Sequence, residues 1–144
     1  MTYQPGELKV VAYKDGKVWA ENVVKTTGRP AGLEATADRK VIRADGEDLV
    51  FVTARVIDKN GLTVPRANNR IRFAIAGPGE IVATDNGDPT SFTPFPSHER
   101  EAFNGLCLVI IRARKGEPGK IKLTASSDGL KVGTTVVTAS KGNR

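Results

Sequence analysis

Residues 84–113, TDNGDPTSFTPFPSHEREAFNGLCLVIIRA, contain the segment that decides the fold. Within it, residues 106–111 form an unbroken apolar run, LCLVII, that is too short for a helix of ordinary length. The run is bounded by Asn104-Gly105 on one side and by Arg112 on the other. Such a bounded run is typical of a central β-strand. We therefore expect a strand here that is buried on both faces.

The chain from Leu33 onward repeats a pattern of short strands and turns. In residues 49–57, Val50, Val52, Ala54 and Val56 fall on one face of the expected strand, as a period of two requires. Further strands are expected at residues 33–37, 70–76, 80–84, 120–125 and 131–138. Turn signals rich in Gly, Asn and Asp separate them about every ten residues, a spacing typical of immunoglobulin-type sandwiches. The sequence predicts an all-β, immunoglobulin-like antiparallel β-sandwich.

A β-hairpin is expected to precede the sandwich. Residues 7–25 contain two β-rich runs around Asp15-Gly16, a dipeptide that accepts positive φ at both turn positions. Tyr13 and Trp19 are its large side chains. A hairpin alone is marginal in water, so its strands need a partner. Residues 26–32, TTGRPAG, read as a linker.

The composition excludes several classes of protein. The chain has 144 residues, 39% of them hydrophobic, which suits a globular protein of one domain or one domain plus a fragment. The net charge is +6, but Lys and Arg are interleaved with Asp and Glu and have no aromatic partners for base stacking, so we expect no nucleic-acid partner. No run approaches the ~20 apolar residues that span a bilayer, and no signal peptide opens the sequence. We expect no membrane partner.

The polar residues do not form a recognisable catalytic or metal centre. One His and one Cys cannot build a Cys/His metal cluster, and His98 reads as an exposed loop residue. Asp85 and Asp88 could supply oxygen ligands for calcium, but turn formation alone explains them and a distal Glu cannot be placed. We expect no metal, no cofactor and no catalytic residue in this chain.

A loop of about ten residues, 89–99, is the candidate functional element, because unstructured loops of this length are uncommon and often functional. It carries Phe92 and Phe95 between prolines. These rings must either dock on something or be exposed.

Four segments carry a resemblance to a known family. Residues 12–39, 44–61, 85–95 and 102–113 resemble the C-terminal part of glycoside hydrolase family 2 enzymes, especially the large β-galactosidases of Bacteroidetes. The resemblance implies that a parent enzyme hydrolyses terminal β-galactosides or related sugars with retention, using two Glu residues of a barrel domain. No segment here resembles that barrel, so no catalytic residue is carried over.

The resemblance also implies a division of the chain. Residues 1–30 match the last hairpin of a preceding immunoglobulin-like domain plus a linker, residues 31–140 match a complete sandwich, and residues 141–144 are a tail. The parent is expected to be periplasmic or secreted. Other domains of the parent are the expected partners, and the hairpin could also form a homodimer.

Three functions remain open from the sequence. The first is a non-catalytic accessory module whose loop packs on a neighbouring domain or shapes the substrate approach. The second is a carbohydrate-binding module that stacks aromatic rings on sugars, and the third is a bacterial adhesion or spacer domain. The candidate contact residues, for carbohydrate or for another domain, are Phe92, Phe95, His98, Asn104 and Trp19.

Overall fold

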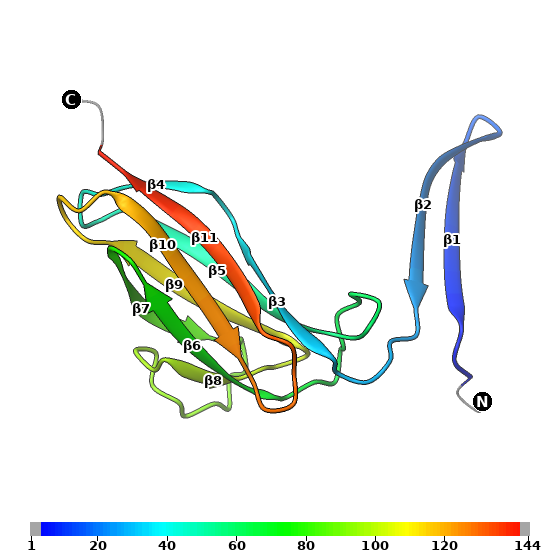
Figure 1. Cartoon of the computed structure of the whole chain (residues 1–144). Coiled ribbons are helices and arrows are strands. Elements are labelled where there is room, and N and C mark those ends of the chain that lie inside the picture. The colour runs from blue at the N-terminus through cyan, green and yellow to red at the C-terminus, as the bar shows by residue number, and fades with distance from the viewer. Residues whose placement is uncertain (1–3, 142–144) are drawn as a thin grey trace.

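The computed structural model describes residues 4–141, which form a β-hairpin and a two-sheet sandwich (Figure 1). All the secondary structure in this range is β. The strands are β1 Glu7–Lys14, β2 Lys17–Lys25, β3 Gly32–Ala37, β4 Val41–Arg43, β5 Leu49–Ile57, β6 Arg70–Ala76, β7 Gly79–Asp85, β8 Glu99–Glu101, β9 Leu106–Ala113, β10 Gly119–Ser126 and β11 Gly133–Ser140. The expected all-β sandwich preceded by a hairpin is confirmed.

The sandwich consists of a five-stranded and a four-stranded sheet. The orders are β4-β11-β10-β6-β8 and β3-β5-β9-β7. Every neighbouring pair is antiparallel except β4 and β11, which run parallel at one edge. The sequence did not predict β4 and β8, which have three residues each and too little pattern to recognise.

The core lies between the two sheets. In β5 the predicted inward residues Val50, Val52, Ala54 and Val56 are all fully buried. They meet apolar side chains of β9 in the same sheet and of β6, β10 and β11 opposite. The largest fully buried side chains on these strands are Ile71, Ile111, Ile121, Leu123, Val109 and Val137, and Ile42 of β4 joins them.

The prediction that residues 106–111 are buried on both faces is wrong. The strand β9 is central, between β5 and β7, but its burial alternates. Cys107, Val109 and Ile111 are buried, whereas Leu106 is 41% exposed and Leu108 and Ile110 are half-buried. An antiparallel sandwich covers only one face of each sheet, so the outward apolar residues of a central strand stay on an open face.

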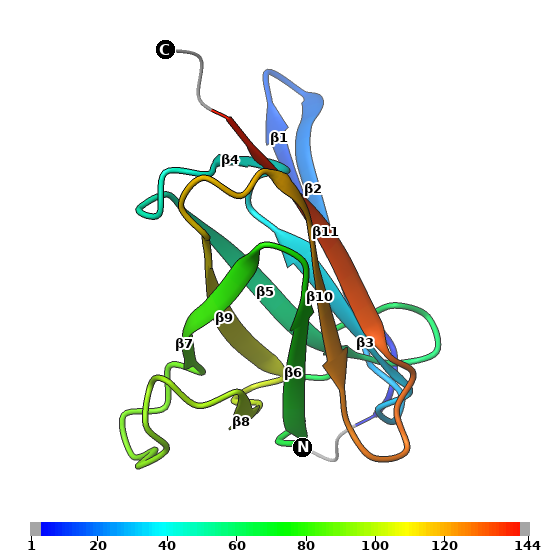
Figure 2. The same ribbon diagram turned by 60° about the vertical axis from the view of Figure 1, so that its left-hand side comes forward.

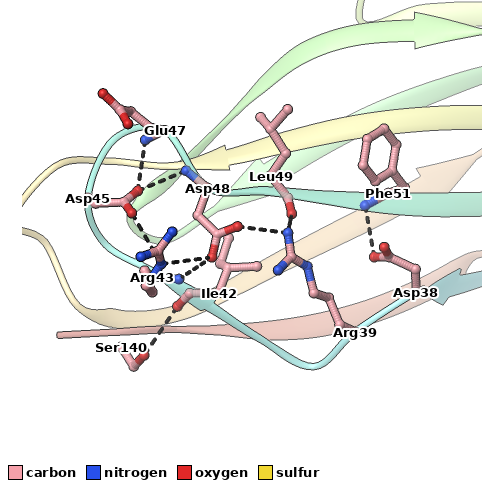
Figure 3. Close-up of polar contacts among 10 residues, drawn as sticks. All are labelled: Asp38, Arg39, Ile42, Arg43, Asp45, Glu47, Asp48, Leu49, Phe51 and Ser140. Carbon is pink, nitrogen blue, oxygen red and sulfur yellow. Dashed lines mark hydrogen bonds and ion pairs between the residues drawn. The ribbon is translucent and has the colours of Figure 1, made fainter. Parts of the chain in front are cut away.

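A polar corner joins β4 of one sheet to β5 of the other (Figure 3). Asp45 Oδ1 accepts the N–H groups of Glu47 and Asp48, which closes the turn. Asp48 accepts the N–H of Arg43 at 2.8 Å and a guanidinium hydrogen of Arg39 at 2.7 Å. These donors, the Arg43 N–H foremost, hold the pKa of Asp48 below its ordinary value.

The hairpin stands apart from the sandwich in Figure 1, and it lies behind the sandwich in the view of Figure 2. Its turn is formed by Asp15 and Gly16 at φ 52° and 72°, as the dipeptide predicted. The linker after it is held at Gly28, whose N–H donates to Asp58 Oδ2 at 2.8 Å. Asp58 is 2% exposed, and its other oxygen accepts the N–H groups of Asn60 and Leu62.

Parts of two predicted segments fall outside the described range. They are residues 1–3 of the expected hairpin segment and residues 142–144 of the expected tail. Within residues 4–141, there is no helix of the length and apolarity needed to cross a membrane.

Candidate functional site

The loop of residues 86–98 joins β7 of the four-stranded sheet to β8 at the edge of the five-stranded sheet. It contains the predicted aromatic pair. The side chain of Phe92 is 99% exposed and that of Phe95 is 63% exposed. The Phe92 ring therefore lies in solvent, and the Phe95 ring is exposed over most of its surface.

The loop is held from below by the side chain of Arg100, in the centre of β8. Arg100 is 2% exposed and donates five hydrogen bonds. Its Nη2 contacts the carbonyl oxygens of Thr84 at 2.6 Å and of Pro94 at 3.0 Å, and its Nη1 contacts that of Thr93 at 3.0 Å. Weaker contacts reach Thr84 Oγ1 at 3.2 Å and Ser91 Oγ at 3.4 Å. One guanidinium thus ties the middle of the loop, residues 91–94, to the end of β7 at Thr84.

The acceptors around Arg100 are neutral. Among the described residues, no carboxylate lies within ion-pair distance of this guanidinium. The Phe95 ring adds a cation–π contact, with its centroid 5.8 Å from Arg100 Cζ. Burying a cation is costly unless its hydrogen bonds are satisfied, and here backbone carbonyls satisfy them. The free-energy cost of burying this cation indicates that the shape of the loop it holds is important.

The β7 end of the loop is a series of turns closed by their own carboxylates. Asp85 Oδ1 accepts the N–H groups of Asn86 and Gly87. Asp88 Oδ1 accepts both the N–H and the hydroxyl of Thr90, and these bonds lower the pKa of Asp88. Across the described chain, no three His, Cys, Asp or Glu side chains are grouped as a metal site would require. Asp85 and Asp88, the two predicted calcium candidates, thus act as hydrogen-bond acceptors within these turns.

The other predicted contact residues lie apart from the aromatic pair or serve the backbone. His98 is exposed, and its carbonyl accepts the Phe73 N–H at 2.8 Å. Asn104 is exposed at φ 52° and forms a tight turn with Gly105 before β9. Trp19 is 72% exposed but lies on β2, in the separate hairpin (Figure 1). The structure therefore brings Phe95 to Arg100 and leaves Phe92 exposed on the same loop, and it does not bring Trp19 to them.

Cys107 lies beneath this loop in the core. It is 2% exposed, and its Sγ donates to the carbonyl of Asp85 at 3.3 Å. Burial raises the pKa of the Cys107 thiol to about 12, although the nearby Arg100 cation opposes that rise. The thiol is a core group and a poor nucleophile at neutral pH.

Sequence reasoning missed Arg100. The interleaving of Lys and Arg with Asp and Glu does not distinguish Arg100 from surface cations, yet Arg100 is buried. The available signal was alternation: in a strand with Glu99 and Glu101 facing outward, Arg100 must face inward. Three residues are too few to make that pattern visible without the pairing to β6.

The comparisons with known proteins agree on one family. A family signature described as "Glycoside hydrolase family 2 C-terminal domain 5" matches residues 33–136, and one described as "Domain of unknown function (DUF4982)" matches residues 1–20. A β-galactosidase of Bacteroides ovatus is 44% identical over 95% of this chain, and a β-glucuronidase of Formosa agariphila is 30% identical over 91%. A solved glycosyl hydrolase family 2 member from Bacteroides cellulosilyticus has a TM-score of 0.91 and 30% identity over 98% of the chain.

All three are much longer proteins. The chain spans 16% of the Bacteroides ovatus relative, 13% of the Formosa agariphila relative and 18% of the solved structure. The names of the first two relatives also differ in the sugar that they state.

Proposed function

Because the chain belongs to the glycoside hydrolase family 2 C-terminal domain 5 family, we propose that it is a non-catalytic accessory module of a longer glycosidase. In this proposal the parent enzyme hydrolyses terminal β-galactosides or related β-glycosides with catalytic residues that lie elsewhere. The module presents the loop of residues 86–98 to a neighbouring domain of the same enzyme. The observation that carries the proposal is a fully exposed Phe92 on a loop fixed by a buried arginine.

The proposal depends on the conformational entropy that a loop loses when it docks. A loop that is already rigid loses little conformational entropy when it docks, so its exposed rings can contribute their full apolar area to a contact. A free phenyl ring in water contributes nothing to the stability of the sandwich. Phe92 and Phe95 are therefore better explained by a contact that this chain alone does not make.

The experiment compares Phe92→Ala in two settings. In the 144-residue chain, the substitution should change the free energy of unfolding by less than about 0.5 kcal/mol, because the ring is exposed. Phe73→Ala in the core is the matched control and should cost about 3–5 kcal/mol. In the longer enzyme, Phe92→Ala should lower the melting temperature or kcat/KM. An unchanged longer enzyme would argue against the docking loop.

Carbohydrate binding is the second candidate, and the same exposed rings favour it. Aromatic side chains that stack on sugars must be accessible, and Phe92 meets that condition. Titration of the 144-residue chain with galacto-oligosaccharides, followed by NMR of residues 86–98, separates the two functions. Saturable shifts that Phe92→Ala abolishes would support a binding module, while the docking module leaves the spectrum unchanged.

The hairpin belongs, in this proposal, to the domain that precedes the sandwich. A two-stranded hairpin is marginal on its own, and Leu8, Tyr13 and Trp19 are all more than half exposed. A homodimer formed through these strands is the competing arrangement. Light scattering of the 144-residue chain at increasing concentration distinguishes them, since a constant monomer mass excludes the dimer.

We also propose that the parent acts in the periplasm or outside the cell. Immunoblotting of fractionated source cells with an antibody to the sandwich tests the location and the size together. A band far above 15.4 kDa in the periplasmic or secreted fraction supports the accessory module. A band at 15.4 kDa would contradict it.

A further inference from the structure

We propose that the notch between the hairpin and the sandwich is a domain interface, occupied by the remainder of the domain to which the hairpin belongs. The inference rests on the proposed function, because it requires a longer polypeptide. It adds a contact on the sandwich itself, at Pro65 and Arg66, that neither the sequence nor the family match indicates.

The two faces of the hairpin differ at its base, where Glu7 pairs with Lys25. Cross-strand pairing places Leu8 opposite Val24, and two residues further along the same face come Val10 and then Ala12. Leu8, Val10 and Val24 are 65%, 60% and 62% exposed. The opposite face carries the ion pairs Lys9–Glu21 at 2.9 Å and Lys25–Glu7 at 3.0 Å. The second face also carries Val11 and Val23, which are half-buried, whereas the first face leaves Leu8 and Val24 exposed at the base of the hairpin.

The apolar face opens at its base into a notch of about 850 Å³. Leu8 and Val24 line one wall, and residues 64–66 of the β5–β6 connection line the other. Pro65 and Arg66 are exposed there, while Val64 is buried in the core. Figure 1 shows this connection projecting from the sandwich toward the hairpin.

The width of the notch is set by hydrogen bonds. The Thr26 N–H donates to the Gly6 carbonyl, which closes the hairpin base. Gly28 is held by the Asp58 carboxylate, and the Ala31 N–H donates to the Ile57 carbonyl at 2.8 Å. The match to the Bacteroides cellulosilyticus structure, over 98% of this chain, includes the hairpin, and that protein is far longer. The same arrangement thus occurs where further domains are present.

The extent of the second family signature and the usual spacing of packed β-layers identify the occupant. The second family signature ends at residue 20, within β2, and so covers only part of a hairpin that cannot form a domain alone. A packed β-layer lies about 10 Å from the sheet it covers. A layer over Leu8 and Val24 would fill the notch, whose other wall includes Pro65.

Hydroxyl-radical footprinting tests the inference on two polypeptides, the 144-residue chain and the longer natural polypeptide that includes it. We expect the oxidation rates of Leu8, Val24 and Pro65 to fall at least fivefold in the longer polypeptide. Val136, which is 48% exposed on the outer face of the five-stranded sheet, is the control residue and should not change. A Pro65→Glu substitution should lower the melting temperature of the longer polypeptide only, whereas Val136→Glu should lower neither.

Each other outcome overturns the inference in a distinguishable way. Protection of Leu8 and Val24 with Pro65 still oxidised at its isolated rate would place the cover elsewhere. Protection that rises with the concentration of the 144-residue chain would identify a second copy as the occupant. An active glycosidase with an open notch overturns the interface alone, whereas a longer polypeptide without glycosidase activity overturns the proposed function.

Discussion

Arg100 Nη2 donates to the backbone carbonyl of Thr84 at 2.6 Å, and this bond joins an edge strand of one sheet to an edge strand of the other. Thr84 is itself fully buried, and its hydroxyl donates a hydrogen bond to the Ser97 carbonyl oxygen at 2.9 Å. Arg100 and Thr84 thus link the edges of the two sheets. The aromatic loop, residues 86–98, runs from one of these two residues to the other.

Removing the guanidinium should loosen the loop and destabilise the sandwich. Arg100→Met keeps most of the side-chain volume but leaves the carbonyls of Thr84, Thr93 and Pro94 without their donor. We expect a loss of about 2–4 kcal/mol in urea unfolding, with increased picosecond-to-nanosecond motion of residues 90–96 in ¹⁵N relaxation. Arg112→Met is the matched control, because Arg112 pairs with Glu80 near the surface and should cost less than about 1 kcal/mol. Equal losses of stability for both variants would contradict this role of the Arg100 guanidinium.

Crowding at Gly105 should make it far less replaceable than another glycine of the same backbone angle. Gly105 has φ 77°, and an added Cβ would lie 2.3 Å from the Val64 carbonyl oxygen. Gly116 has φ 76° with no atom within 4 Å of that position. Gly116→Ala should therefore cost about 1–2 kcal/mol from the backbone angle alone. Gly105→Ala should cost several kcal/mol or prevent folding, as measured by circular dichroism and urea unfolding.

Acid should destabilise the sandwich through two carboxylates. The pKa of Asp58 is lowered by the backbone N–H groups that donate to it, those of Gly28 and Leu62 foremost. The pKa of Asp48 is lowered foremost by the backbone N–H of Arg43. A lowered folded-state pKa means that the unfolded chain binds more protons in acid. The stabilisation is complete above the ordinary Asp pKa of 3.8 and is lost as the pH falls through the folded-state values. Urea midpoints between pH 6 and pH 2 should show this decline, and an Asp48→Asn, Asp58→Asn double variant should reduce it.

Cys107 should resist modification until the sandwich unfolds. Its side chain is 2% exposed, and the pKa of the thiol is raised to about 12 by burial. Reaction with a disulfide reagent at pH 8 should be slow in buffer, with a rate set by opening of the sandwich, and fast in 8 M urea. A fast native reaction would show that β9 opens readily beneath the aromatic loop.

Alternation made much of the fold predictable. The period of two in residues 49–57 placed four residues correctly in the core, and Asp15-Gly16 identified its turn and the φ values there. The apolar run at residues 106–111 gave the right strand but the wrong exposure. Its outward face remains open because of the number of layers in the fold, which is a property that no local pattern contains.

The candidate site was only half predictable. The loop and its phenyl rings stood out from length and composition, whereas Arg100 did not. Its burial depends on carbonyl groups of residues 84, 93 and 94 that converge only after the loop has folded. Asp58 is similar, since its partner Gly28 is separated from it in the sequence by β3, β4 and β5.

The parallel pairing of β4 with β11 has a consequence for the order of folding. Val41 pairs with Thr138, so the five-stranded sheet gains its β4 edge only when nearly the whole chain is available. Contacts this distant in sequence are slow to form, while a hairpin with a two-residue turn closes in about 1–10 μs. During synthesis on the ribosome, β1 and β2 therefore pair long before the sandwich can close. The apolar strip of the hairpin is exposed first and has the longest time to meet whatever precedes it.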